Sequence, residues 1–174
     1  KLFKAIRGLP NYVADYYKFK AGFSGSLVFQ PCLGDRFEQA GATSNEYFWQ
    51  DLLVARQVFL KRPDKHVDVG SRVDGFVAHV ASFREVEVFD IRQVTTTIPG
   101  VLFRRADFMS ADSVASYVLG EQGYCDSLSC LHAIEHFGLG RYGDQVDPQG
   151  YVRGISNLAK LLVPGGYLYL STPI

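Results

Sequence analysis

His66-Val67-Asp68-Val69-Gly70-Ser71-Arg72-Val73-Asp74-Gly75 joins a short β-prone run to a polar turn that contains two glycines. Val67 and Val69 predict a strand that stops at Gly70, and Phe76–Val80 predicts a helix. A strand, a glycine turn and a helix N-terminus together collect free backbone N–H groups and the positive end of the helix dipole. This segment therefore predicts a cradle for a small polar ligand.

Acidic residues recur downstream, each close to an apolar run: Asp90, Asp107 and Asp126. Asp90 ends the second predicted strand, Val86–Phe89, at the place where a doubly wound sheet can hold a ribose by its hydroxyls. The chain closes with a helix end, a Pro164-Gly165-Gly166 turn and one more strand. Strands and helices thus alternate, which predicts an α/β doubly wound sheet of five parallel strands.

Helix signals separate these strands. A capping box from Thr43 to Glu46 predicts a helix with Thr43 as its N-cap, and Ser110 or Asp112 would cap another that runs to about Leu119. The last helix would start at Asp147-Pro148 and bury a stripe made of Val152, Ile155, Leu158 and Leu162. By contrast, Ile91–Gly100 is short and contains three consecutive threonines, so we expect an irregular crossover there.

These motifs, in their order, resemble the class I S-adenosylmethionine-dependent methyltransferases. The resemblance rests on Asp68-x-Gly70, Asp90, Ala106-Asp107-Phe108, Ile134-Glu135-His136 and Leu162-Val163-Pro164-Gly165-Gly166-Tyr167. Within that class, Asp68–Arg72 and His136–Asp144 resemble a branch first catalogued as a nematode domain of unknown function. The resemblance covers residues 45–174, which would form the cofactor-binding domain.

The resemblance implies a Rossmann-like, mostly parallel sheet and S-adenosylmethionine as cofactor. Asp68, Gly70, Ser71 and Arg72 would lie at its methionine end, Asp90 would hold the ribose hydroxyls, and Asp107 with Phe108 would line the adenine. The methyl acceptor would be a small molecule, such as a hydroxyl of a sugar or glycan precursor. Class I members normally continue past the fifth strand, so the chain, which ends at Ile174, would lack the usual last strands.

Candidate catalytic residues follow the fourth strand in His132-Ala133-Ile134-Glu135-His136, with Arg141, Tyr142 and Asp144 shortly after. In an open α/β sheet the ligand crevice lies at these carboxyl ends of the strands. His136 is the first candidate for a general base toward a hydroxyl, and His132 the second. The alternative is a structural role for both histidines, hydrogen-bonded at the start of a helix.

Two other enzyme classes fit less well. His132-x-x-Glu135-His136 matches the inverted zinc-protease motif, but no glutamate follows Glu135 to serve as third ligand, so we predict no metal. Gly70-x-Arg72-x-x-Gly75 has arginine where a dinucleotide fold needs glycine beside the pyrophosphate. Arg72 also replaces a usual glycine of the methyltransferase turn, although it could pair with Asp74 or Asp90. Together with the short ending, it supports an alternative function, a catalytically silent binding or scaffold domain.

Composition describes a globular chain: 174 residues, 47% hydrophobic and 21% charged, enough for one domain with its own core. Its 18 basic and 18 acidic residues cancel, which gives no general electrostatic reason to bind nucleic acid or an anionic membrane. Neither a membrane-spanning run nor a signal-peptide pattern occurs. Cys32, Cys125 and Cys130 lack Cys-x-x-Cys spacing and fit a reducing compartment, so we expect a cytoplasmic protein.

Residues 1–44 carry an aromatic, helix-like segment that glycines then interrupt. This segment could be a lid over the cofactor or an arm packed on a sheet edge, and the sequence leaves both open. The chain begins with Lys1 instead of Met, so we expect a trimmed or fragmentary version of something longer.

Overall fold

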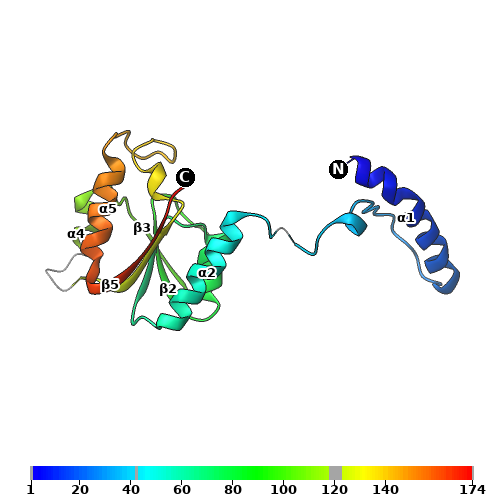
Figure 1. Ribbon diagram of the computed structural model, residues 1–174, viewed down its shortest axis with the longest axis horizontal. Helices are drawn as coiled ribbons and strands as arrows, with labels where there is room; N and C mark the ends of the chain where they lie inside the picture. The colour runs from blue at the N-terminus through cyan, green and yellow to red at the C-terminus, as the bar shows by residue number, and fades with distance from the viewer. Residues whose placement is uncertain (1, 42, 118–122, 174) are drawn as a thin grey trace. The chain divides into compact units, whose positions relative to one another are not determined.

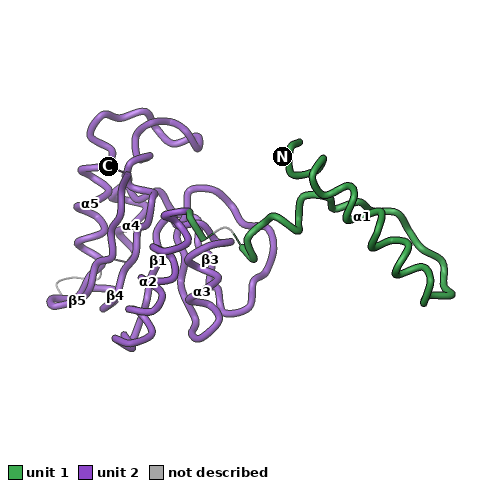
Figure 2. The backbone as a smooth tube through the Cα atoms, turned by 45° about the vertical axis from the view of Figure 1, so that its right-hand side comes forward, with its two compact units in different colours: residues 1–44 green, residues 45–174 purple. Residues whose placement is uncertain are grey.

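The computed structural model of the chain describes residues 2–41, 43–117 and 123–173. The chain divides into two compact units, Lys1–Ser44 and Asn45–Ile174, which Figure 2 shows in different colours. The first unit contains helix α1, Leu2–Gly22, and a short 3-10 turn, Asp35–Phe37. Its role as a lid or a packing arm stays a prediction. No helix among the described residues is long and apolar enough to cross a membrane.

The second unit is built on a five-stranded sheet with the order β3-β2-β1-β4-β5. The strands are β1 His66–Val69, β2 Val86–Asp90, β3 Val101–Arg105, β4 Cys125–Leu131 and β5 Leu162–Ser171. Every neighbouring pair runs parallel, so the predicted doubly wound α/β sheet is confirmed. Because β2 and β4 flank β1, the strand order reverses at β1, and ligands bind such sheets at that switch point.

Helices cover both faces of the sheet (Figure 1). On one face, α2 (Glu46–Lys61) and α3 (Ala78–Ala81) pack through Ala55, Val58 and Val80 against β2. On the other, α4 (Ala111–Ala115) and α5 (Gly150–Leu161) supply Val114, Leu158 and Leu161 to a second buried cluster. Both clusters are built from aliphatic and aromatic side chains, so burial on two faces holds the central strands in place.

Several predicted helix boundaries need correction. The N-cap of α2 is Asn45 and not Thr43, because the Asn45 side chain accepts a hydrogen bond from the Tyr47 N–H at 2.9 Å. Ser110 caps α4 as predicted, but this helix ends at Ala115; the predicted end near Leu119 lies outside the described residues. The last helix begins at Gly150 instead of Asp147-Pro148, since Gln149 is its N-cap.

The crossover Ile91–Gly100 contains no helix, as its sequence predicts. Pro164-Gly165-Gly166 does not form a separate turn before β5; it lies inside the strand, at an irregularity in the pairing with β4.

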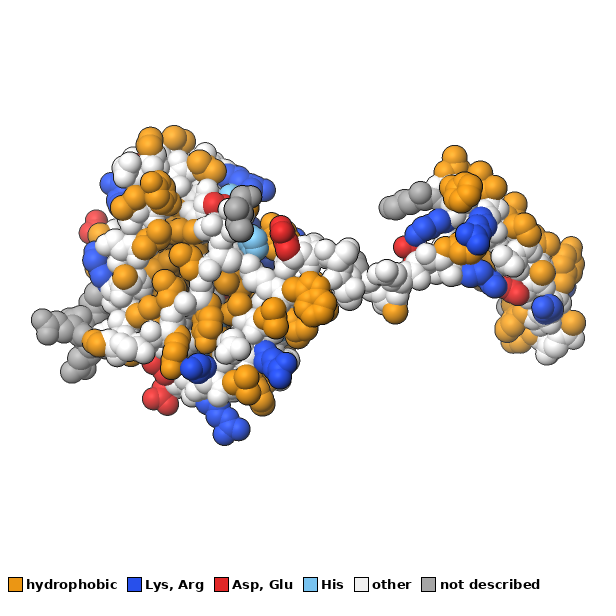
Figure 3. All heavy atoms as spheres, in the orientation of Figure 1, with side chains coloured by type: hydrophobic (Ala, Val, Ile, Leu, Met, Phe, Trp, Pro, Cys, Tyr) orange, Lys and Arg blue, Asp and Glu red, His pale blue; other side chains and the backbone are white. Residues whose placement is uncertain are grey.

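The predicted buried stripe of α5 is only half right. Leu158 is buried and Leu162 partly buried, but Val152 and Ile155 are exposed. The strand that follows this helix, β5, stands last in the strand order and likewise exposes Leu168 and Leu170. Figure 3 shows hydrophobic side chains gathered over this part of the second unit. Within the described part of the second unit these side chains are exposed, so the stripe is not part of its core.

Candidate functional site

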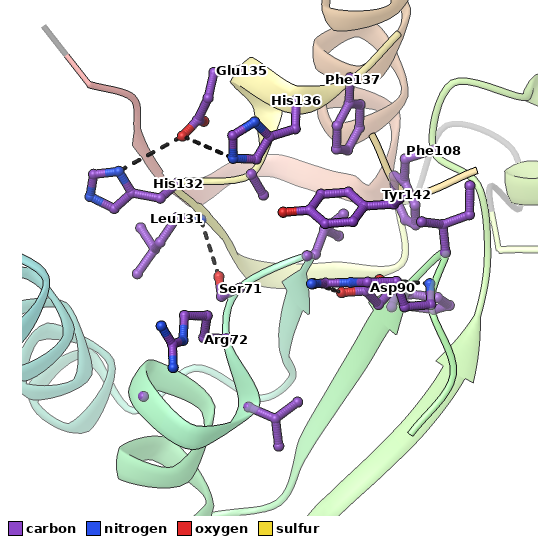
Figure 4. A pocket seen from close by; sticks show the side chains of 18 of the residues that line it. Ser71, Arg72, Asp90, Phe108, Leu131, His132, Glu135, His136, Phe137 and Tyr142 are labelled. Carbon is purple, nitrogen blue, oxygen red and sulfur yellow. Dashed lines mark hydrogen bonds and ion pairs between the residues drawn. The ribbon is translucent and has the colours of Figure 1, made fainter. Parts of the chain in front are cut away.

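The loops that leave the carboxyl ends of the strands line one cavity of about 1170 Å³. The segments after β1, β2, β3 and β4 contribute to its wall, as do the first turn of α2 and Pro173 after β5. Of the residues predicted to form the site, eight lie in this wall: Gly70, Ser71, Arg72, Asp90, Asp107, Phe108, His132 and His136. Figure 4 shows several of them around the cavity. Asp68, the ninth, lies beneath the wall and does not line it.

Asp68 is fully buried in β1 and organises the turn that follows. Its carboxylate accepts hydrogen bonds from the Ser71 N–H at 3.1 Å, the Ser71 hydroxyl at 2.6 Å and the Ser129 hydroxyl at 2.5 Å. Ser71 Oγ in turn accepts from the Leu131 N–H at 3.1 Å, which joins the turn after β1 to the end of β4. Asp68 therefore acts on the cavity through the shape of the turn.

The buried polar contacts continue below Asp68. Ser129 Oγ lies 3.2 Å from His66 Nε2, and His66 Nδ1 lies 2.8 Å from Ser127 Oγ. Burial lowers the pKa of His66 to about 3, whereas burial raises the pKa of Asp68 to about 6 against the opposing hydrogen bonds from Ser129 and Ser71. Two titratable groups with opposite pKa shifts thus share one hydroxyl inside the sheet.

Gly70 ends β1 with φ +76°. A Cβ at this position would lie 2.9 Å from the Cβ of Ala133, closer than real side chains approach. The Gly70 N–H is used by the Phe89 carbonyl at 2.9 Å, so it is not free for a ligand. Only glycine therefore allows the turn to pass so close to the segment after β4.

Asp90 lies at the end of β2 and is bound by its own neighbour. Its carboxylate accepts from the Arg92 N–H at 2.7 Å, from Arg92 Nε at 2.9 Å and from Arg92 Nη2 at 2.5 Å. The Arg92 guanidinium also lies 4.4 Å from the centroid of the Tyr142 ring. A carboxylate has about four lone-pair positions, so Arg92 leaves Asp90 little capacity for another donor.

Asp107 and Phe108 follow β3 on the same side of the cavity. Asp107 Oδ1 accepts from the Met109 N–H at 2.9 Å, and its backbone N–H donates to Ser113 Oγ at 3.0 Å. No described residue donates to Asp107 Oδ2. Phe108 is buried against Phe89, with ring centroids 5.4 Å apart, so it supports the wall more than it faces the cavity.

His132, Glu135 and His136 meet after β4 (Figure 4). Glu135 Oε1 lies 3.8 Å from His132 Nδ1 and 3.9 Å from His136 Nε2. Ile134–His136 forms a single 3-10 turn, and His132 precedes it with φ +49°. The two histidines therefore do not lie on one face of an α-helix, but the turn directs both imidazoles to one carboxylate. Positive φ at a residue other than glycine is uncommon and often occurs at functional sites.

Two buried polar atoms around this turn, His132 Nδ1 and Glu135 Oε2, have no hydrogen-bond partner among the described residues. An unsatisfied buried polar atom is costly, so its presence in a cavity wall indicates a position that a ligand or water completes. Among residues 2–41, 43–117 and 123–173, no cluster of three or more His, Cys, Asp or Glu side chains is arranged to hold a metal ion.

The Arg72 side chain lies in the cavity wall but does not fill the cavity. Its Nε and Nη2 donate to the two carboxylate oxygens of Asp74 at 2.9 and 2.6 Å, which is one of the two pairings that the sequence allowed. Both side chains are strongly exposed.

Two further residues of the wall complete the site. Tyr47, at the start of α2, lies against His132 with ring centroids 4.2 Å apart. Its aromatic character in the sequence was compatible with a core, surface or ligand role. No motif predicts Arg92; its only signal is the spacing Asp90-x-Arg92, typical of an aspartate that accepts from the N–H two residues on.

Comparison with known proteins agrees with this fold. Residues 80–174 match the family described as "Caenorhabditis protein of unknown function, DUF268", and the chain belongs to that family. Its fold is similar to that of S-adenosylmethionine-bound CalS10, described as an amino pentose methyltransferase from Micromonospora echinaspora involved in calicheamicin biosynthesis. The TM-score is 0.54 at 20% sequence identity, with 87% of this chain and 60% of that chain covered.

The fold class is therefore a Rossmann-like, methyltransferase-like domain. The chain spans 60% of the length of the CalS10 chain. No curated protein matches the sequence.

Proposed function

We propose that this protein is an S-adenosylmethionine-dependent methyltransferase that acts on a small molecule, such as a hydroxyl of a sugar or glycan precursor. The observation that carries the proposal is the single cavity at the strand ends, which gathers the turn after β1, Asp90, Asp107 and the His132–His136 turn. The similarity of the fold to a methyltransferase supports it. The three free cysteines are compatible with a reducing compartment, which we propose is the cytoplasm.

The residues present fit this cofactor. A cavity of about 1170 Å³ exceeds the usual volume of a small-ligand pocket, roughly 300–1,000 Å³, so cofactor and acceptor have room together. Gly70 keeps the turn after β1 free of a side chain, where the methionine end would lie. Asp107 Oδ2 is available to accept from the adenine amino group. Asp90 would hold the ribose hydroxyls once the Arg92 side chain gives up part of its carboxylate.

The bound cofactor would supply a methyl group on a positively charged sulfur, which needs an in-line nucleophile more than it needs activation. The chain's own task is then to orient the acceptor hydroxyl and take its proton. His136 Nε2 is the first candidate base, because Glu135 Oε1 at 3.9 Å can stabilise the imidazolium that proton transfer creates. His132 Nδ1, at 3.8 Å from the same oxygen, is the second.

The test is calorimetric titration of the protein with S-adenosylhomocysteine, with NAD as the comparison ligand. We expect micromolar binding of S-adenosylhomocysteine, no binding of NAD, and a loss of at least tenfold in affinity in Asp90→Asn. Asp112→Asn is the matched control, because Asp112 is an exposed aspartate of α4 outside the cavity wall. No heat with S-adenosylhomocysteine, or equal affinity in Asp90→Asn and wild type, contradicts the proposed cofactor site.

A further inference from the structure

The loop Gly138–Asp144, which we call the Asp144 loop, is held from inside by one carboxylate. Asp144 Oδ2 accepts from the N–H groups of Gly138 and Gly140, both at 3.1 Å, and Oδ1 accepts from the Tyr142 N–H at 3.0 Å. Burial works to raise the pKa of Asp144, but these backbone N–H groups outweigh it and lower the pKa. The loop is thus preorganised around an ionised carboxylate.

The Asp144 loop places Arg141 and Tyr142 in the cavity wall beside the candidate base. Arg141 Nη1 lies 3.3 Å from His136 Nε2 and 3.4 Å from Nδ1, and the guanidinium carbon is 5.2 Å from the Tyr142 ring centroid. The His136 and Tyr142 rings meet edge-on, with centroids 5.8 Å apart. Arg141, Tyr142 and His136 therefore form one contiguous surface inside the cavity.

Arg141 differs from the other arginines of the wall in its charge balance. Arg72 is paired with Asp74 and Arg92 with Asp90, each through two guanidinium nitrogens. Arg141 forms no ion pair with any carboxylate in the part of the chain that the structure describes. Its guanidinium faces an imidazole, which can accept from it only when neutral. A cation in a ligand cavity without a counter-charge is matched to an anionic ligand, because guanidinium binds carboxylate and phosphate through paired hydrogen bonds.

We propose that Arg141 binds an anionic group of the methyl acceptor, a phosphate or a carboxylate, and that this contact frees His136 to act as the base. The proposal rests on the proposed function and adds the substrate class. With Arg141 engaged by the anion, the lone pair of His136 Nε2 becomes available to the acceptor hydroxyl. With the cofactor bound, His136 Nε2 would take the hydroxyl proton as the hydroxyl oxygen takes the methyl group, and the electron pair of the sulfur–carbon bond that breaks would stay on the sulfur.

The test uses protein saturated with S-adenosylhomocysteine and three sugar probes: glucose 1-phosphate, glucuronic acid and glucose. Affinities come from calorimetry, and the imidazole proton resonance of His136, assigned with His136→Gln, reports contact beside the base. We expect at least one anionic probe to bind about tenfold or more tightly than glucose and to shift that resonance. Whichever anionic probe binds more tightly identifies the group as phosphate or carboxylate.

Arg141→Gln should remove this preference, and Arg141→Lys should restore part of it, because lysine keeps the charge without the paired donors. Arg56→Gln is the matched control, since Arg56 is an exposed arginine of α2 outside the cavity wall. The inference is overturned if neither anionic probe exceeds glucose, or if Arg141→Gln keeps the wild-type preference. Binding of S-adenosylhomocysteine is measured on the same samples: its loss contradicts the proposed function, and its retention without anion preference overturns only this inference.

Discussion

Asp68 and His66 lead to opposite predictions for two variants: as pH falls, Asp68→Asn should lose stability relative to wild type and His66→Gln should gain it. Burial raises the pKa of Asp68 from 3.8 to about 6, so between these values the folded protein binds a proton that the unfolded chain does not. Burial lowers the pKa of His66 from 6.5 to about 3, so the unfolded chain binds a proton there that the folded protein does not. As pH falls from 6 toward 4, Asp68 therefore adds stability and His66 removes it.

The two contributions nearly cancel in the wild type. From pH 6.0 to 4.5, the linkage relation gives a gain of about 1.5 kcal/mol from Asp68 and a loss of about 2 kcal/mol from His66. Asp68→Asn leaves the His66 contribution alone, so its free energy of unfolding should fall by about 1.5 kcal/mol relative to wild type over this range. His66→Gln leaves the Asp68 contribution alone and should gain about 2 kcal/mol relative to wild type.

The measurement is urea denaturation followed by circular dichroism at pH 6.0, 5.5, 5.0 and 4.5 and constant ionic strength. Comparison of each variant with wild type at the same pH cancels the other carboxylates that titrate in this range. Asparagine has one acceptor oxygen, so it can keep the bonds from the Ser71 and Ser129 hydroxyls but loses the bond from the Ser71 N–H. Asp68→Asn should therefore be less stable at every pH, and the prediction concerns only how its difference from wild type changes with pH. Asp112→Asn, which removes an exposed carboxylate of α4, is the control for the loss of one aspartate.

If the free energies of unfolding of Asp68→Asn and wild type change in parallel between pH 6.0 and 4.5, the raised pKa of Asp68 is refuted. If Asp68→Asn does not fold, His66→Gln alone decides the matter. Its stability must then rise, relative to wild type, as pH falls, and a flat difference shows that neither group titrates in the way that burial requires.

Three further predictions concern the wall of the cavity and the cysteines. Gly70→Ala should lower the free energy of unfolding by roughly 1–3 kcal/mol more than Gly143→Ala, as measured by urea denaturation. Both glycines have positive φ, but only at Gly70 does an added Cβ meet another residue, so equal losses would contradict the close approach to Ala133. Arg92→Ala should raise the affinity for S-adenosylhomocysteine by up to about fivefold in calorimetry, because the ion pair between the half-exposed Arg92 and Asp90 is worth up to about 1 kcal/mol. A fall in affinity would show that Arg92 helps to bind the ligand. A thiol reagent should modify only Cys32 in the folded protein and all three cysteines in urea. The reason is that burial raises the pKa of Cys125 to about 12 and also raises the pKa of Cys130. Rapid modification of a second thiol in the folded protein would contradict the burial of Cys125 and Cys130.

The strands could be predicted from the sequence because each is a short run rich in apolar side chains, and two of them stop at a clear signal, β1 before Gly70 and β2 at Asp90. The helix ends could not be predicted as well, since capping depends on geometry that several neighbouring residues can supply. Thr43 and Asn45 are both good N-caps, and only the path of the chain into Glu46 selects Asn45. Likewise, Val152 and Ile155 have the spacing of a buried stripe, but burial also needs something to cover them.

The candidate site, too, could be predicted only in part from the sequence. Gly70, Asp90 and the His132–His136 turn could be placed at one edge of the sheet, because the carboxyl ends of parallel strands meet there. The sequence could not show that Asp68 is covered and acts through Ser71, because that depends on packing between β1 and β4. Nor could it show which of three arginines lacks a counter-charge, because Arg72, Arg92 and Arg141 each have an aspartate within three residues along the chain.

Arg72 bears most directly on the choice between an enzyme and a catalytically silent domain. In the sequence it favours the silent domain, because a long charged side chain stands where the turn usually has glycine. In the structure its guanidinium donates to both oxygens of Asp74, and its exposed side chain does not fill the cavity. A scaffold that binds no ligand would also have no need of an imidazole beside a glutamate with an unsatisfied buried oxygen, which is what His136 and Glu135 form. Such costly groups are retained in a protein when a ligand completes them, so the geometry favours a site that binds a ligand over a scaffold that binds none.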